Sequence, residues 1–161
     1  SLTHSPPAGN PPSICNQPMM RHRTLTLLLL LALTGLTACH PDGAPCEVTI
    51  GDARCSITPY TDARFTSLTH PGGYAYVTGG HRGMVVCCLA LGEYAAYERT
   101  CPCDNTSKVA MSADWAGVLE CPTCHSCYDT YNHGAPFDDN TTLCALYEYS
   151  VHCDGTTLQI Y

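Results

Sequence analysis

Apart from one long apolar stretch near its start, the chain alternates short apolar runs with clusters of turn-forming residues. After about residue 47 the runs are rich in β-branched and aromatic residues, and Gly or Pro clusters separate them. We find neither a long helical period nor an internal repeat. The pattern predicts strands at residues 48–50, 64–68, 74–78, 84–89, 94–98, 118–120, 143–149 and 157–161.

The last two predicted strands flank Asp154-Gly155, a dipeptide that favours a tight hairpin turn. Strands this short and this closely spaced favour a small all-β sandwich or barrel. The ten tyrosines lie mostly in these strands, and we interpret them as cross-strand pairs rather than as a stacking surface for sugars or bases. The sequence therefore predicts one all-β domain over residues 47–161.

The long apolar stretch, residues 25–36, is about half as long as the roughly 20 residues that a membrane-spanning helix needs. A positive segment at residues 21–23 precedes it, and small residues follow it. This arrangement is typical of a cleaved signal peptide. We therefore expect residues 19–38 to be a signal peptide and residues 1–18 to be an upstream or disordered leader.

The signal ends in Leu36-Thr37-Ala38-Cys39, which resembles the lipobox of bacterial lipoproteins. The alternative is an ordinary secretory signal with an incidental cysteine. The resemblance implies that Cys39 is lipidated and anchors the chain in the cell envelope, at the periplasmic or outer-membrane side. Two or three acyl chains hold a protein stably at a membrane. Residues 39–46 have turn chemistry and are expected to form a tether to the domain.

The charge balance is acidic, with seven Lys or Arg against fourteen Asp or Glu and a net charge of −7. This balance argues against a nucleic-acid partner and against electrostatic docking on anionic lipid. Thirteen cysteines are many for a chain of this length. An exported protein can hold such thiols in disulfides or in a metal site.

Four of the cysteines form two close pairs, Cys101-Pro102-Cys103 and Cys121-Pro122-Thr123-Cys124. Two such pairs on two loops can converge on one tetrahedral site, and thiolates are suited to zinc or to iron–sulfur clusters. In an exported chain the same four thiols can instead form two disulfides. The spacing alone leaves these alternatives open.

The second pair begins the run Cys-Pro-Thr-Cys-His-Ser-Cys-Tyr-Asp at residues 121–129. It resembles the second cluster-binding box of Rieske [2Fe–2S] proteins, commonly Cys-Pro-x-His-Gly-Ser-x-Phe/Tyr-Asp. The first pair resembles their Cys-x-His box, and residues 134–136 resemble their third loop. Upstream segments resemble an exported, lipoprotein-like branch of the family. The resemblance covers about residues 47–161 and implies a Rieske-like β-sandwich or barrel with a small inserted cluster-binding subdomain near residues 100–130.

Both ligand histidines of that family are replaced here, by Cys103 and Cys124. A Rieske centre carries two Cys on one iron and two His on the other, which raises its reduction potential. We expect a cluster held by Cys101, Cys103, Cys121 and Cys124 to have a potential near roughly −400 mV, as in plant-type ferredoxins. Without a ligand imidazole, the potential is also expected to vary little with pH near neutrality.

Four residues adjoin these ligands in the second box. His125 is expected to hydrogen-bond a cluster sulfur or to serve as an alternative ligand. The resemblance places Ser126 and Tyr128 beside the cluster, and it implies a loop-bridging disulfide near Cys127.

Other cysteines are given structural roles. Cys46 and Cys55 are placed to close a small loop at the start of the domain. A bond between Cys87 and Cys88 is not expected, because neighbouring residues of a strand point to opposite faces.

The resemblance implies a membrane-anchored electron-transfer protein whose partners are redox proteins at the same membrane. No Ser/His/Asp set, paired-carboxylate motif or phosphate loop is visible, so we do not expect an enzyme that acts by itself. The alternative is an envelope lipoprotein of Rieske-like fold that has lost its cluster. Such a protein would be stabilised by zinc or disulfides and would have a structural or binding role.

Overall fold

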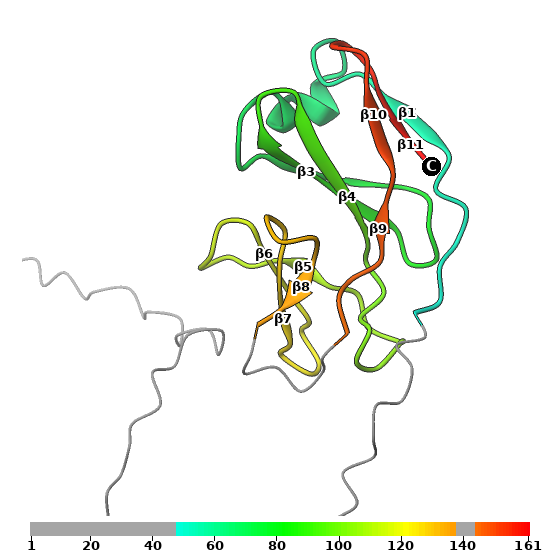
Figure 1. The fold of residues 1–161 in the computed structure, drawn as a ribbon, viewed down its shortest axis with the longest axis vertical. Coiled ribbons are helices and arrows are strands. Elements are labelled where there is room, and N and C mark those ends of the chain that lie inside the picture. The colour runs from blue at the N-terminus through cyan, green and yellow to red at the C-terminus, as the bar shows by residue number, and fades with distance from the viewer. Residues whose placement is uncertain (1–47, 138–143) are drawn as a thin grey trace, which may run out of the picture.

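The computed structural model describes residues 48–137 and 144–161. Within these residues the chain forms eleven strands and one 3₁₀ helix, η2, which confirms the predicted all-β class (Figure 1). The elements are β1 Cys55–Ile57, η2 Ala63–Thr69, β2 Tyr74–Val77, β3 Met84–Ala90, β4 Glu93–Glu98, β5 Ala110–Met111, β6 Val118–Glu120, β7 Cys127–Asp129, β8 Ala135–Pro136, β9 Glu148–Tyr149, β10 Val151–Cys153 and β11 Leu158–Ile160.

The strands form three antiparallel sheets, in the orders β1-β11-β10, β2-β3-β4-β9 and β5-β6-β7-β8. The chain leaves the second sheet at the end of β4 and returns to it in β9, the hydrogen-bonded neighbour of β4. The third sheet is therefore inserted between two adjacent strands. Figure 1 shows it as a small unit below β3 and β4 in this view.

The two central strands of the second sheet, β3 and β4, are buried on both faces, and β3 shows this most clearly. Met84, Val86 and Cys88 belong to a core shared with the first sheet and η2. Val85 and Cys87, between them in the sequence, belong to a second core shared with the inserted sheet and its loops. A strand that is covered on both faces needs apolar residues at every position, and this explains the continuous apolar run of β3.

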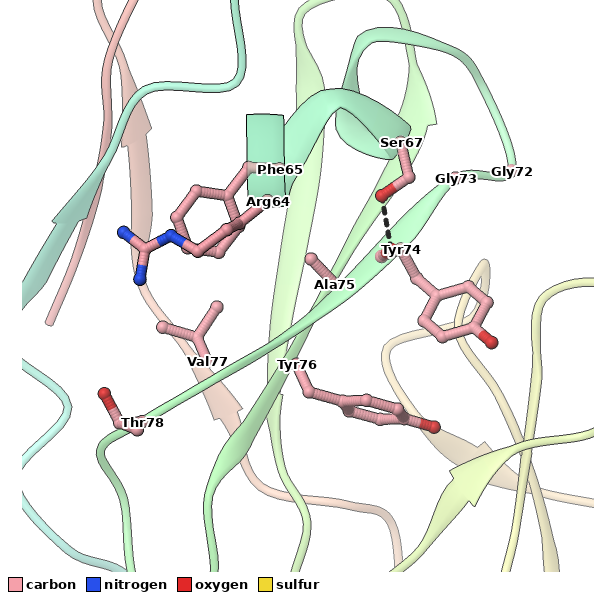
Figure 2. A pocket seen from close by; sticks show the side chains of 10 residues that line it. All are labelled: Arg64, Phe65, Ser67, Gly72, Gly73, Tyr74, Ala75, Tyr76, Val77 and Thr78. Carbon is pink, nitrogen blue, oxygen red and sulfur yellow. Dashed lines mark hydrogen bonds between the residues drawn. The ribbon is translucent and has the colours of Figure 1, made fainter. Parts of the chain in front are cut away.

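One edge of the second sheet is β2, which η2 partly covers. Figure 2 shows Ala75 and Val77 of β2 on the side of Phe65, whereas Tyr74 and Tyr76 point to the other side. This alternation is the period of two that a strand imposes on its side chains. The Ser67 hydroxyl of η2 donates a hydrogen bond to the Tyr74 carbonyl at 2.6 Å, so part of the exposed strand edge is satisfied by a side chain.

Five predicted strands are confirmed, two are wrong, and the strand predicted at residues 143–149 is present only as β9 at its end. Residues 48–50 form no strand. Residues 64–68 lie in η2, because the Asp62 carboxylate accepts a hydrogen bond from the Arg64 amide at 3.0 Å and caps the helix. Phe65 and Leu68, three residues apart, then share the buried side of η2. Asp154-Gly155 lies in a hairpin turn as predicted, but the strand before it is β10, which the sequence did not predict.

Several described cysteines lie outside the paired motifs. Cys87 and Cys88 are both free and lie in different cores, as expected for neighbours in a strand. Cys55 is also a free thiol, so the predicted Cys46–Cys55 bridge is wrong. Cys46 and the predicted lipidation site Cys39 lie outside the described residues. In the described part of the chain, no helix has the length and apolar character needed to cross a membrane.

A fully buried carboxylate, Glu98 at the end of β4, joins several of these segments. It accepts hydrogen bonds from the amides of His81 at 2.7 Å, Arg82 at 3.0 Å and Thr100 at 2.9 Å. The hydroxyls of Thr100 and Tyr149 donate to it as well, each at 2.8 Å. Five donors thus satisfy a charge that would otherwise be very costly to bury.

The pKa of Glu98 reflects this surrounding. Burial acts to raise the pKa, but the hydrogen bonds from the Arg82 and His81 amides and from the Tyr149 and Thr100 hydroxyls outweigh it. The result is a pKa below the ordinary value of a glutamate, so the carboxylate is ionised at neutral pH.

Glu98→Gln is expected to lower the free energy of unfolding by about 3 kcal/mol, because an amide cannot accept from all five donors. Urea unfolding measured by circular dichroism tests this. The matched control is Glu93→Gln at the exposed start of β4, which should cost less than about 0.5 kcal/mol.

The difference in the free energy of unfolding between the wild type and Glu98→Gln is also expected to depend on pH. Since the folded-state pKa of Glu98 is lowered, its stabilisation is complete above the unfolded pKa of about 4.3 and is lost as the pH falls through the folded value. The stabilities of wild type and Glu98→Gln should therefore converge under acid conditions. A constant difference down to pH 2 would contradict this account.

Candidate metal centre

Three thiols converge at the junction of the second core and the inserted sheet. The Sγ atoms of Cys101, Cys121 and Cys124 all lie within 4.8 Å of one another, and those of Cys101 and Cys124 are 3.6 Å apart. Cys101 and Cys121 are fully buried and belong to the second core, whereas Cys124 is half-buried. Cys101 follows β4 closely and Cys121 directly follows β6, so the two sheets fix the starting points of both loops.

The two loops have the same local construction. The Asn105 amide donates to the Cys101 carbonyl at 2.8 Å, and the His125 amide donates to the Cys121 carbonyl at 3.0 Å. Both Asn105 and His125 have left-handed backbone conformations, with φ of 53° and 59°. Each loop thus turns back four residues after its first cysteine, which directs its thiols to a common point.

Side chains couple the two loops to each other. The Asp104 carboxylate accepts from the Ser107 amide at 2.8 Å and from the Ser107 hydroxyl at 2.6 Å, which closes the first loop. The Ser107 hydroxyl in turn donates to the Thr123 hydroxyl of the second loop at 2.7 Å. We did not predict these three residues as part of the site. The short Asp-x-x-Ser spacing was the available signal, since Asp and Ser commonly close turns in this way.

Polar groups surround the sulfur atoms themselves. The backbone amides of Cys103 and Asp104 donate to the Cys101 sulfur. The Tyr128 hydroxyl lies 3.5 Å from the same sulfur, and the Ser126 hydroxyl lies 3.3 Å from that of Cys124. Ser126 and Tyr128 therefore lie beside the thiols. Donors of this kind stabilise thiolates and orient metal ligands.

The thiols differ in acidity. Burial raises the pKa of Cys101 to about 12. Burial also acts to raise the pKa of Cys124, but hydrogen bonds from Ser126 and from the thiols of Cys121 and Cys101 outweigh it and lower the pKa to about 7. A thiolate is the form that binds metals, and a bound cation makes the thiolate form of a buried cysteine favourable. The site is thus poised to bind a soft cation.

Other predicted site residues lie outside this group of three. Cys103 is exposed on the first loop, although its amide faces Cys101. His125 is exposed, and its Nδ1 lies 3.6 Å from a Glu120 carboxylate oxygen rather than among the thiols. Cys127 is disulfide-bonded, as is Cys144, so a nearby disulfide is present. Cys127 therefore has a structural bond and does not offer a thiol to a metal.

The third loop of the family resemblance, residues 134–136, packs against the core below the thiols. A Cβ atom on Gly134 would lie 3.0 Å from Leu146 and 3.1 Å from the Tyr97 ring, so this position is tight as well as left-handed. The Tyr97 hydroxyl donates to the Thr130 carbonyl at 2.9 Å. These contacts join the inserted sheet to the second sheet.

Comparison with known proteins gives structural similarity only. No protein-family profile matches the chain, and none of the curated proteins does. A solved structure of the ferredoxin of carbazole 1,9a-dioxygenase from Nocardioides aromaticivorans IC177 is similar over 56% of this chain and 85% of that chain, at 20% identity and a TM-score of 0.39. A second, a complex of reduced oxygenase and oxidized ferredoxin in carbazole 1,9a-dioxygenase, covers 56% of this chain and 82% of that chain, at 18% identity and a TM-score of 0.36.

The described residues therefore define an all-β protein with a group of cysteines that can bind a metal. The two loops that hold the group start from different sheets and are coupled by hydrogen bonds. This construction suits a preformed centre more than a pair of structural disulfides, because the 3.6 Å between the Cys101 and Cys124 sulfurs far exceeds a bond of about 2.05 Å.

His125→Gly is expected to raise the free energy of unfolding by about 1 kcal/mol, because the left-handed conformation of His125 is costly for a residue with a Cβ atom. The lost pairing with Glu120 is exposed and contributes little. Thermal unfolding of the metal-free protein measures the change. The control is His70→Gly, whose φ of −131° is ordinary, and it should show no gain.

Proposed function

We propose that this protein is a Rieske-like electron-transfer protein that carries a [2Fe–2S] cluster on Cys101, Cys103, Cys121 and Cys124. The observation that carries the proposal is the pair of matched loops, which bring both cysteine boxes to one point at the junction with the inserted sheet. The domain would pass electrons to redox proteins at the same membrane and would not act as an enzyme by itself.

The residues present fit such a group in their chemistry. The thiols of Cys101, Cys121 and Cys124 lie close together, and Cys103 supplies a fourth thiol on the same loop as Cys101. Amide and hydroxyl donors reach the sulfurs of Cys101 and Cys124, as is typical where thiolates bind iron–sulfur clusters. The donor set is entirely sulfur, so it resembles that of plant-type ferredoxins more than that of Rieske centres.

The burial of the four cysteines gives the site an inner and an outer side. Cys101 and Cys121 are fully buried, whereas Cys124 is half-buried and Cys103 is exposed. A bound cluster supplies a one-electron couple. The buried Tyr128 and the apolar core exclude water from the inner side, and the outer side lies near the surface where a partner can approach.

A structural zinc site is a second candidate, and one distance favours it. The sulfurs of Cys101 and Cys124 are 3.6 Å apart. This is close to the edge of roughly 3.8 Å that a tetrahedron with Zn–S bonds of about 2.3 Å would have. A protein of this kind would keep the fold and use the metal only for stability.

Reconstitution with iron and sulfide under anaerobic conditions distinguishes the two candidates. The electron-transfer proposal expects a reddish-brown protein with about two irons and two sulfides per chain. Cys101→Ser, Cys121→Ser and Cys124→Ser should each lose the cluster, because each removes a ligand thiolate. Cys87→Ser is the matched control, since Cys87 is buried in the same core but lies outside the group, and it should retain full iron content.

A colourless protein with one bound zinc would reject the cluster and favour the structural site. The reduction potential gives an independent check at two pH values. A four-thiolate cluster should lie near roughly −400 mV at both. A high or strongly pH-dependent potential would count against ligation by four cysteines.

We also propose that lipidation of Cys39 anchors the protein to a membrane of the cell envelope. The support is the lipobox-like sequence that ends at Cys39 and the short apolar segment before it. Two or more acyl chains would hold the domain firmly, while residues 39–46 would let it reach its partners. The acidic domain itself offers little attraction to anionic lipid.

Cys39→Ser is expected to move the protein from the membrane fraction to the soluble fraction of an expressing bacterium, because the thioether to the lipid cannot form. Cell fractionation with immunoblotting measures the distribution. Cys46→Ser, in the same tether, should stay with the membrane. An unchanged distribution of Cys39→Ser would exclude a lipid anchor at this residue.

A further inference from the structure

A second concave site lies outside the thiol loops, at the turn between β2 and β3. This groove, which we name the basic groove, is lined by His81, Arg82, Arg99 and Lys108 together with the glycine-rich turn at residues 79–83. Its volume is about 590 Å³. The proposed electron-transfer function does not use it.

The charge of the basic groove is unusual for this chain. After residue 38 the sequence has five Lys or Arg against fourteen Asp or Glu, and three of the five line this one groove. The other two, Arg54 and Arg64, pair with Asp52 and Asp62. In the part of the chain that the structure describes, no carboxylate lies within ion-pair distance of the three cations of the groove.

The guanidinium of Arg99 is held in a fixed position. Its Nε donates to the Val109 carbonyl at 2.9 Å, and its Cζ lies 3.9 Å from the centre of the Tyr76 ring. Figure 2 shows this ring extending from β2 on the side away from Phe65. Among the described residues, the terminal nitrogens of Arg99 have no hydrogen-bond acceptor. A planar cation that is fixed at one end and unpaired at the other is well suited to bind an oxyanion.

Arg82 carries the second observation. Its Nε is buried and has no hydrogen-bond partner among the described residues. A buried donor without a partner is costly, and most such groups in proteins are satisfied. The nearest buried acid, Glu98, does not fill this role, because it accepts from the Arg82 backbone amide and from four other donors. The buried Nε itself is out of reach of a ligand oxygen, but among the described residues the terminal nitrogens of Arg82 have no acceptor either, so its guanidinium is unpaired beside the groove.

We propose that the basic groove binds an oxyanion, the carboxylate or phosphate group of a small ligand. Arg82 and Arg99 supply hydrogen-bond donors, and the exposed Lys108 adds charge. Gly79, Gly80 and Gly83 of the turn also line the groove. This binding does not depend on a metal at the cysteines, so it stands or fails separately from the proposed cluster.

The test follows the Nε–Hε resonance of Arg82 by ¹H–¹⁵N NMR, in the metal-free full domain at constant ionic strength. Inorganic phosphate and acetate are added in separate titrations to tell the two anion types apart. A saturable shift of this resonance, with a dissociation constant of roughly 10 mM or lower for one of them, is the expected result.

Variants then test the assignment. Arg82→Gln and Arg99→Lys should each weaken binding about tenfold, since each removes a charged or forked donor. Arg54→Gln removes the same charge as Arg82→Gln at a site outside the groove and should change the affinity less than about twofold. The backbone amides of the turn report binding in every variant, and urea unfolding verifies that each is folded.

The absence of a saturable shift with either anion would overturn the proposal. An equal loss of affinity in Arg54→Gln would overturn it as well, because it would show general screening of an acidic protein. Measured iron content of the same variants should be unchanged. Cys101→Ser, which should lose iron, should still bind the anion, so failure of the cluster proposal and failure of the groove proposal are distinguishable.

Discussion

The arrangement of the whole molecule depends on one buried carboxylate. Among the described residues no cation forms an ion pair with Glu98, and five hydrogen bonds stabilise its charge instead. The donors come from the turn after β2, from the end of β4 and from Tyr149 in β9. Because an ionised buried group is tolerated only when all its donors are in place, these segments must assemble together. Cys101 follows three residues later, so the same constraint fixes the start of the first thiol loop.

The candidate metal centre is consequently an extension of the hydrophobic core. Cys101 and Cys121 pack with Val109, Leu119 and Tyr128, so the inner thiols are held as core residues are held. Only the outer cysteines depend on loop conformation. A metal that binds folded but not unfolded protein adds its binding free energy to the stability of the fold. The core and the centre would therefore support each other in the loaded protein.

The sequence predicted the regular parts of the structure well, for reasons visible in particular residues. The apolar runs of β3 and β4 and the Asp154-Gly155 turn have strong local signals, and all three are confirmed. The strand predicted at residues 64–68 was wrong, since its β-like composition is overridden by the Asp62 cap. Glu98 was missed because an acidic residue is usually exposed, and its burial depends on donors far away in the sequence. The spacing of the two cysteine pairs was enough to predict that Cys101, Cys121 and Cys124 lie close together. The exposure of Cys103 depends on the backbone path of the first loop, which the spacing does not determine.

The insertion of the third sheet between two adjacent strands has a consequence for how the chain folds. The hairpins β2–β3 and β3–β4 pair residues close in sequence, whereas Ala96 and Tyr149 of β4 and β9 pair only after the intervening segment has been looped out. Closing a long loop costs conformational entropy that grows only slowly with its length. Local hairpins should form early and the β4–β9 contact late. The inserted sheet can therefore vary in length at little cost, since its ends return to neighbouring positions whatever lies between them.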